Sequence, residues 1–200
     1  SYKFTRKELG IPSNGFIFTC FNNIQKITRK EFNIWMKLLQ KVDKSYLWLM
    51  KPNPTAIINI QNELTKAGIE KERIVFAEKM NINDHLSRHS CGDLFLDTFN
   101  YNAGTTASDS LWAGLPLITL LGKSYSSRMA ASMLTACNLK ELITYTEYEY
   151  EALAYELAIN KDKLREINIK LKKKEDLILF NSSNFTEELE AIFTNLVNSN

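Results

Sequence analysis

Cysteine and histidine are scarce in this 200-residue sequence, which contains three cysteines and two histidines. Cys20, Cys91 and Cys137 stand far apart and form no CxxC pair, so the sequence gives little support to a zinc site. Cys20 lies within an apolar run and is interpreted as a small buried hydrophobic residue. We therefore predict no bound metal and expect a protein of the reducing cytoplasm.

Long apolar runs and a strong charge of one sign are also absent from the sequence. No stretch approaches the roughly 18 apolar residues that a membrane span needs, and no signal peptide opens the chain. The 25 basic and 23 acidic residues leave a net charge of +2, which argues against a nucleic-acid-binding protein. One basic cluster on a predicted late helix is interpreted as a solvated face. It consists of Lys170, Lys172, Lys173 and Lys174.

The residues that are present suffice for one domain with a sizeable core, because 44% are hydrophobic and 11% aromatic. Apolar runs typical of buried strands alternate with segments of helical periodicity. The predicted strands are 16–21, 46–50, 73–77, 93–97, 117–121 and 141–144. The predicted helices are 28–42, 55–67, 81–90, one from 105 or 106 to 114, 124–136, and most of 146–200.

Local signals support these boundaries. Thr28, Thr146 and Asn184 are each followed three residues later by Glu, which marks helix starts. Gly68 marks a helix end. Strands separated by single helices predict a parallel sheet with right-handed crossovers. We predict an α/β fold, a doubly wound Rossmann-like sheet with helices on both faces, that spans 1–200 and has a helical tail from about 146.

Ligands of such sheets bind outside the carboxyl ends of the strands, which here selects 22–26, 79–88, 98–109 and 121–128. The third segment is the most informative. Gly104 lets the backbone approach a ligand closely, and the helix start after it favours a phosphate. Thr105 and Thr106 add hydroxyl donors, and Asp109, one turn later, suits a ribose. The alternative is an ordinary helix cap. The sequence has neither a GxGxxG nor a GxxxxGK[ST] motif.

The first two segments add further candidates. Lys26 follows the first strand and can supply a point charge to a diphosphate, or it is a surface lysine of a loop. His85 and Arg88 are three residues apart and share a helix face, where they can stack on and hydrogen-bond a base. The alternative is that His85 is a surface or core residue. Ser126 and Ser127 lack the context of a hydrolase nucleophile.

Several ordered motifs resemble the O-linked N-acetylglucosamine transferase and SPINDLY family. They are FNNIQK (21–26), HLSR (85–88), DT (97–98), YNAGTTASD (101–109), LWAGLP (111–116), SRMAAS (127–132) and EYEY (147–150). The resemblance spans about 16–195. The family has a two-lobed GT-B architecture, and the chain resembles its C-terminal lobe, which binds the nucleotide of the sugar donor.

The resemblance implies a role for each candidate residue. Lys26 would contact the diphosphate and support departure of the leaving group, and Asn23 would lie near the phosphates or the sugar. Thr105 and Thr106 would bind the diphosphate. The remaining nucleotide-sugar-binding candidates are His85 and Arg88 against the base, Asp109 at the ribose, and Met80 and Gly104. No cofactor or metal is implied.

Two departures from the family pattern leave the donor open. Gly104 replaces a histidine of the animal enzymes, and a base-side lysine is replaced near Ile82. The leading hypothesis is inverting transfer of N-acetylglucosamine from UDP-N-acetylglucosamine to protein Ser or Thr hydroxyls. GDP-fucose as donor and a non-catalytic nucleotide-binding or interaction module are the alternatives. The opening residues resemble the interior of a longer protein. Without the N-terminal lobe, its catalytic histidine and the tetratricopeptide repeats, the chain is expected to transfer little or no sugar.

Overall fold

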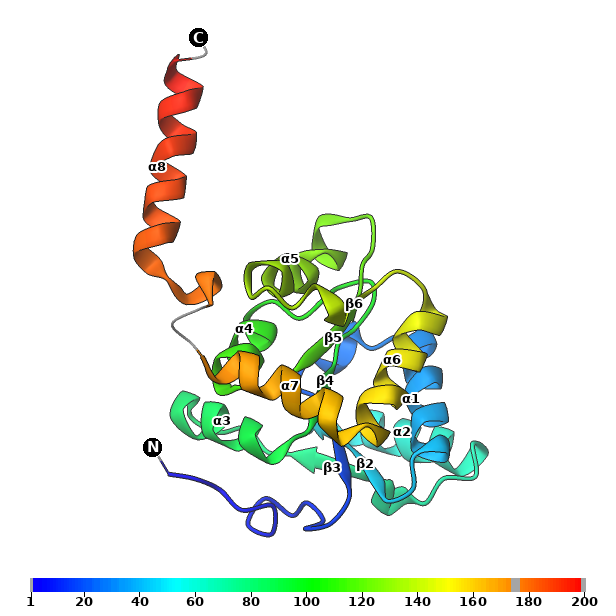
Figure 1. Cartoon of the computed structure of the whole chain (residues 1–200). Helices are drawn as coiled ribbons and strands as arrows, with labels where there is room; N and C mark the ends of the chain where they lie inside the picture. Colours follow the sequence, from blue (N-terminus) through cyan, green and yellow to red (C-terminus); the bar gives the residue numbers. More distant parts are fainter. Residues whose placement is uncertain (1, 174–176, 199–200) are drawn as a thin grey trace.

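The computed structural model describes residues 2–173 and 177–198, and its centre is a six-stranded sheet (Figure 1). All strand pairs are parallel, in the order β3-β2-β1-β4-β5-β6. The strands are β1 (Phe16–Cys20), β2 (Ser45–Met50), β3 (Ile74–Ala77), β4 (Leu94–Leu96), β5 (Leu117–Leu120) and β6 (Ile143–Thr144). The predicted doubly wound parallel sheet is confirmed.

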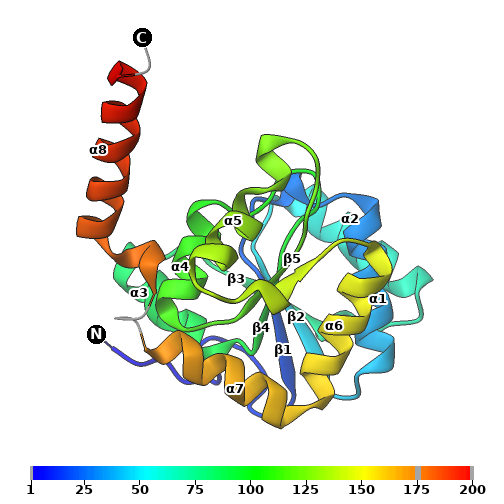
Figure 2. The same ribbon diagram turned by 45° about the horizontal axis from the view of Figure 1, so that its top comes forward.

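Helices cover both faces of this sheet. Figure 2 shows α1, α2 and α6 on one side and α3, α4 and α5 on the other. The helices are α1 (Arg29–Lys41), α2 (Pro54–Lys66), α3 (Ile82–Arg88), α4 (Thr105–Ala113), α5 (Met129–Ala136), α6 (Glu147–Ile159), α7 (Lys161–Lys172) and α8 (Ser182–Asn198). Short 3-10 turns are Ile24–Lys26, Lys71–Arg73, His89–Cys91, Tyr125–Ser127, Lys140–Leu142 and Ile178–Phe180.

The strands are buried because both of their faces pack against helices. Ile17, Leu47, Leu94, Phe95 and Leu117 are fully buried, as expected for continuous apolar strands in a parallel sheet. On α1 the apolar side chains face this core, and the capping box of Thr28 and Glu31 is present. Apolar burial therefore fixes the sheet between its two helical layers.

The order of the strands determines where a ligand site can form. The chain moves outward from β1 to β2 and β3, and then returns to β4 on the other side of β1. The loops after β1 and β4 diverge at this switch point, which is where open α/β sheets bind ligands. Two of the four predicted segments, 22–26 and 98–109, lie there.

Several boundaries differ from the sequence predictions, notably those of α8, α5 and β4. α8 begins at Ser182, and the Asn181 side chain accepts from the backbone N–H of Asn184 at 3.0 Å. The predicted start at Asn184 is therefore wrong, because Asn184 lies inside the first turn. The predicted helix 124–136 is a 3-10 turn followed by α5. β4 (Leu94–Leu96) is one residue shorter at each end than the predicted strand 93–97.

The C-terminal part of the chain is largely helical, as predicted. α7 buries Ile167 and Leu171, whereas α8 buries no residue and stands away from the sheet (Figures 1 and 2). In the predicted basic cluster, Lys172 and Lys173 are exposed and Lys170 pairs with Glu141 at 2.5 Å. Lys174 lies outside the described residues. None of the described helices is long and apolar enough to cross a membrane.

Candidate functional site

A buried carboxyl group organises the loop between β4 and α4. Oδ1 of Asp97 accepts from the backbone N–H groups of Thr98 (2.8 Å) and Ala103 (2.6 Å) and from Nδ2 of Asn22 (3.2 Å). Oδ2 accepts from the hydroxyl of Thr119 at 2.7 Å. Burial raises the pKa of Asp97 to about 7, and the four donors act in the opposite direction. These bonds close the loop over the end of β4.

The same network joins the loops that follow β1 and β4. The hydroxyl of Thr106 donates to Oδ1 of Asn22 at 2.5 Å, and Nδ2 of Asn22 donates to Asp97 and to the Thr98 hydroxyl. Asn22 therefore bridges the start of α4 and the end of β4. Two of the predicted segments are brought together as expected, but the Thr106 hydroxyl already has a partner within the protein.

Lys26 completes the contact between the two loops. Its Nζ donates to the carbonyl of Asn102 at 3.1 Å and lies 4.0 Å from the ring centre of Tyr101. Burial lowers the pKa of Lys26, and the charge of Asp97 opposes that shift. The lysine is thus a positioned cation, held against the loop that leads into α4, and not a freely solvated one.

The start of α4 has no side-chain cap. Its N-cap is Gly104, which is buried and offers no side-chain acceptor. Six other helices have one: α1, α2, α3, α6, α7 and α8 are capped by Thr28, Asn53, Asn81, Thr146, Asn160 and Asn181. Thr105 is exposed beside this uncapped end. Backbone N–H groups, the helix dipole and one hydroxyl are therefore available to an anion.

The structure places Arg88 behind His85 and not beside it. Arg88 is 1% exposed, and its guanidinium lies 4.5 Å from the ring centre of Phe21. It donates to the carbonyl of Glu78 at 2.6 Å and to Nδ1 of His85 at 2.6 Å. Arg88 is therefore placed to position His85, and only the histidine keeps part of its side chain exposed (15%).

The arginine also fixes the protonation of His85. Because an arginine N–H can only donate, Nδ1 of His85 accepts and the ring proton lies on Nε2. Burial and the nearby Arg88 charge lower the pKa of His85 to about 4. Nε2 lies 4.0 Å from Oδ2 of Asp109 on α4, whose pKa burial raises. The predicted base-side and ribose-side residues are thus adjacent.

His89 supports this arrangement from inside the protein. Its ring lies 4.7 Å from the His85 ring and 5.1 Å from the Phe21 ring, centre to centre. Its Nδ1 lies 2.7 Å from the carbonyl of His85. Burial lowers the pKa of His89 to about 3. His89 is not among the predicted site residues, and it packs against His85 and Phe21.

The remaining candidates lie at the rim. Asn23 is exposed, and its Oδ1 accepts from the backbone N–H of Gln25 at 3.1 Å, which begins the 3-10 turn that contains Lys26. Met80 and Ile82 are 37% and 59% exposed, in and after the loop that leads to α3. A Cβ added to Gly104 would lie 2.9 Å from Cε of Met129. The glycine thus leaves little space for a side chain.

Sequence reasoning missed the residues that hold the site together. Asp97, Asn22 and Thr119 form the network, and the hydroxyl of Tyr150 on α6 donates to the Asp97 carbonyl at 3.0 Å. A signal was present, because Asn22 and Asp97 are polar residues at the ends of two apolar runs. Their partners, however, come from distant parts of the chain.

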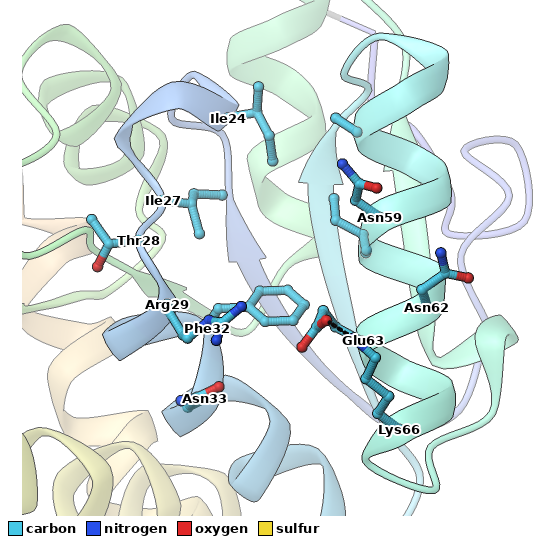
Figure 3. Close-up of a pocket in the computed structure, with 12 residues that line it drawn as sticks. Ile24, Ile27, Thr28, Arg29, Phe32, Asn33, Asn59, Asn62, Glu63 and Lys66 are labelled. Carbon is cyan, nitrogen blue, oxygen red and sulfur yellow. Dashed lines mark hydrogen bonds and ion pairs between the residues drawn. The ribbon is translucent and has the colours of Figure 1, made fainter.

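Two cavities lie beside the loops that follow β1 and β4. One, of about 440 Å³, is a groove between α1 and α2, with Ile24, Ile27 and Phe32 facing Asn59 and Glu63 (Figure 3). The other, of about 570 Å³, lies between the loops after β4, β5 and β6. Neither of these two contains Lys26, Thr105 or His85. The candidate anion-binding groups therefore lie on an open edge of the sheet. Among the described residues, no group of three or more His, Cys, Asp or Glu side chains could hold a metal ion.

Comparisons with known proteins identify relatives of the chain. Residues 3–189 match the model of glycosyl transferase family 41. The chain is 32% identical over 167 residues to a UDP-N-acetylglucosamine–peptide N-acetylglucosaminyltransferase of Caenorhabditis elegans, with 84% of the chain and 14% of that protein covered. It is 34% identical over 190 residues to a SPINDLY protein of Oryza sativa, with 92% and 20% covered. The chain thus spans about a fifth or less of the length of these relatives.

Solved structures give the same result. An O-GlcNAc transferase mutant of Thermobaculum terrenum superposes with a TM-score of 0.84 at 27% identity, over 90% of this chain and 35% of that one. WaaG, a glycosyltransferase involved in lipopolysaccharide biosynthesis, superposes with a TM-score of 0.63 at 14% identity, over 84% and 44%. The second match shows the fold alone, that of one half of a GT-B glycosyltransferase.

Proposed function

The chain belongs to glycosyl transferase family 41, and from this membership we propose that it binds the nucleotide-sugar donor of a protein glycosyltransferase. The donor would be UDP-N-acetylglucosamine and the acceptor a polypeptide, as the names of the relatives suggest. The acceptor group would be a Ser or Thr hydroxyl, as the resemblance to the family implies. The observation that carries the proposal is the contact of Lys26 with the loop that leads into the uncapped start of α4.

The proposed chemistry is stabilisation of a leaving group. As the bond between the anomeric carbon and the diphosphate breaks, negative charge builds on the diphosphate oxygens. Lys26, the N–H groups at the start of α4 and the Thr105 hydroxyl would meet that charge without reorganising. Thr106 would act differently, because its hydroxyl is bonded to Asn22. It would hold the helix start in place.

The nucleoside would extend from the diphosphate toward α3. A neutral His85, with its proton on Nε2, can stack on a base or donate to it. Asp109, one turn into α4, can accept from ribose hydroxyls. Met80 lies at the rim on this side, and Asn23 lies at the rim next to Lys26. Arg88 would act through His85.

The acceptor hydroxyl needs a general base that these residues do not supply. Lys26 and Asp109 would be engaged by the donor, and Asp97 is fully buried. We propose that the base, with the N-terminal lobe and the repeats of the relatives, belongs to a larger enzyme. The chain alone should then bind nucleotide and transfer little or no sugar.

Calorimetric titration of the chain with UDP, GDP and ADP tests the proposal. UDP should bind best, and Lys26→Ala should weaken it about tenfold, since one charge-assisted contact is lost. Lys37→Ala removes an exposed lysine of α1 and should have no effect. Absence of nucleotide binding at millimolar concentration would favour a non-catalytic module. Tighter GDP binding would favour the fucose donor, for which the exposed Ile82 at the base-side lysine position is the supporting observation.

A further inference from the structure

The cavity of about 570 Å³ takes no part in the proposed donor site but shares a wall with it. It is bounded by the loops after β4, β5 and β6 and by the start of α1. Phe99 and Asn100 line it and belong to the same loop as Gly104 and the Lys26-bound carbonyl of Asn102. An occupant of this cavity would therefore lie next to a bound donor.

The floor of the cavity is a preformed loop. The backbone N–H of Gly122 donates to the carbonyl of Ser127 at 2.8 Å, and that of Ser124 to the Ser127 hydroxyl at 3.1 Å. A Cβ at Gly122 would collide with the Ser127 side chain. Ser126 is bound to the donor-side loop, because its hydroxyl donates to the Asn100 carbonyl at 3.1 Å and its carbonyl accepts from the backbone N–H of Asn102 at 2.8 Å. Such a loop loses little conformational entropy when a ligand binds.

The lining offers charge and aromatic surface. Lys30 pairs with Glu147 at 3.3 Å, whereas Lys123 makes no ion pair within residues 2–173 and 177–198. Two lysines and one glutamate leave the lining with a net charge of +1. The side chain of Tyr145 is 68% exposed at the rim. This combination suits a polar chain that carries an acidic side chain.

We propose that this cavity binds an acidic segment of the polypeptide acceptor, close to the hydroxyl that receives the sugar. The inference rests on the proposed function. An acceptor must approach the sugar from the carboxyl edge of the sheet, and the cavity opens at that edge, beside the loop that holds the diphosphate. Its volume falls within the range of pockets for ligands of a few residues. Lys123 would pair with the acidic side chain, and Tyr145 would pack on the peptide.

The test is a titration of the isotope-labelled chain, saturated with UDP, followed by NMR. The probe is a blocked peptide with one serine flanked by aspartates, and the matched peptide has lysines in their place. The acidic peptide should shift the resonances of Gly122, Lys123, Ser124 and Tyr145, and the basic peptide should bind at least about fivefold more weakly.

Two variants with the same change of charge sharpen the test. Lys123→Glu should weaken the acidic peptide about tenfold and leave UDP affinity unchanged. Lys161→Glu is the control, because α6 extends about 20 Å away from this edge before Lys161 begins α7. It should leave both affinities unchanged.

Several results would overturn the inference. Equal binding of the two peptides, shifts confined to other surfaces, or an unchanged affinity in Lys123→Glu would each do so. Equal shifts from inorganic phosphate or free aspartate would show a small-anion site without peptide recognition, which also contradicts it. The UDP titration is separate, so its failure would refute the proposed function whatever the peptides do.

Discussion

Two helices begin at the same edge of the sheet and differ in how their first turns are completed. At α6, the hydroxyl of Thr146 accepts from the backbone N–H of Glu149 at 3.1 Å, and the Glu149 carboxylate accepts from the N–H groups of Tyr145 and Thr146 at 2.7 and 3.2 Å. α4 begins at Gly104, without a side-chain cap and without an acidic residue in its first turn. The first turn of α6 is completed by side chains of its own chain, whereas the first backbone N–H groups of α4 have no side-chain cap.

The loop in front of α4 is where the largest effect is expected. Asp97→Ala removes the acceptor of four buried or half-buried donors, including two backbone N–H groups. Leaving such groups without partners should lower the free energy of unfolding by about 3 kcal/mol or more. UDP binding should be lost with the loop. Chemical denaturation and calorimetry measure the two effects.

Asp97→Asn is the matched control for this prediction. The amide keeps one carbonyl oxygen for the backbone donors, and its NH₂ group can donate to the Thr119 hydroxyl. It should therefore retain most of the stability that Asp97→Ala loses. Equal destabilisation by the two variants would show that the negative charge, and not the hydrogen-bond geometry, holds the loop.

The hydrogen-bond partners of Asp97 could not be predicted from the sequence, for a physical reason. Its partners Asn22 and Thr119 lie 75 and 22 residues away, and only the return of the chain to β4 beside β1 brings them together. The start of α4 at Thr105, by contrast, was predictable from Gly104 and two threonines, because a helix boundary is a local property.

Other predictions also succeeded where they depended on neighbouring residues and failed where they depended on residues distant in the chain or on backbone geometry. The three-residue spacing of His85 and Arg88 correctly predicted a shared helix face. It did not reveal that the rings of Phe21, just after β1, and Trp48 of β2 pack against the arginine. The predicted helix start at Asn184 is wrong because Asn181, also an asparagine, occupies the capping position three residues earlier. Capping chemistry identifies candidates, and backbone geometry selects among them.

A change of pH provides a second comparison between the region around α4 and the region around α6. Both histidines of the chain lie in or directly after α3, which packs on α4, and neither lies near α6. The pKa of buried His89 is lowered from 6.5 to about 3, so the unfolded chain takes up a proton that the folded chain does not. Stability from this residue is therefore present above pH 6.5 and is lost as the pH falls. The loss between pH 7 and pH 5 should be about 2 kcal/mol.

The measurement compares unfolding of the wild type and His89→Gln at several pH values. The two differ in their pH slopes, which isolates His89 from Asp97 and the other titrating groups. The wild type should lose more stability on acidification than the variant does. Parallel curves would contradict a neutral buried His89.

A carboxylate placed at the uncapped start of α4 should abolish the difference in capping between α4 and α6. Gly104→Asp supplies the acceptor that α4 lacks and places a negative charge where a diphosphate would bind. UDP affinity should fall at least about tenfold. Gly104→Ala is the control, because it adds only the Cβ that meets Met129. If the two variants bound UDP equally, steric crowding and not charge would explain the loss, and the open helix end would not be the phosphate site.

The smallest effect is expected at α6, whose first turn is already capped by side chains. Thr146→Ala removes the hydroxyl that accepts from the Glu149 N–H, and loss of a cap of this kind costs about 1 kcal/mol of stability. UDP affinity should not change, since the side chains of Thr146 and Glu149 already accept from the backbone N–H groups at the start of α6. Denaturation and calorimetry on one protein sample report both quantities. A variant that lost stability and nucleotide affinity together would show that α6 also contributes to the donor site. In that case a helix start that is already capped by side chains would also bind UDP. The difference in capping between α4 and α6 would then not indicate where the nucleotide binds.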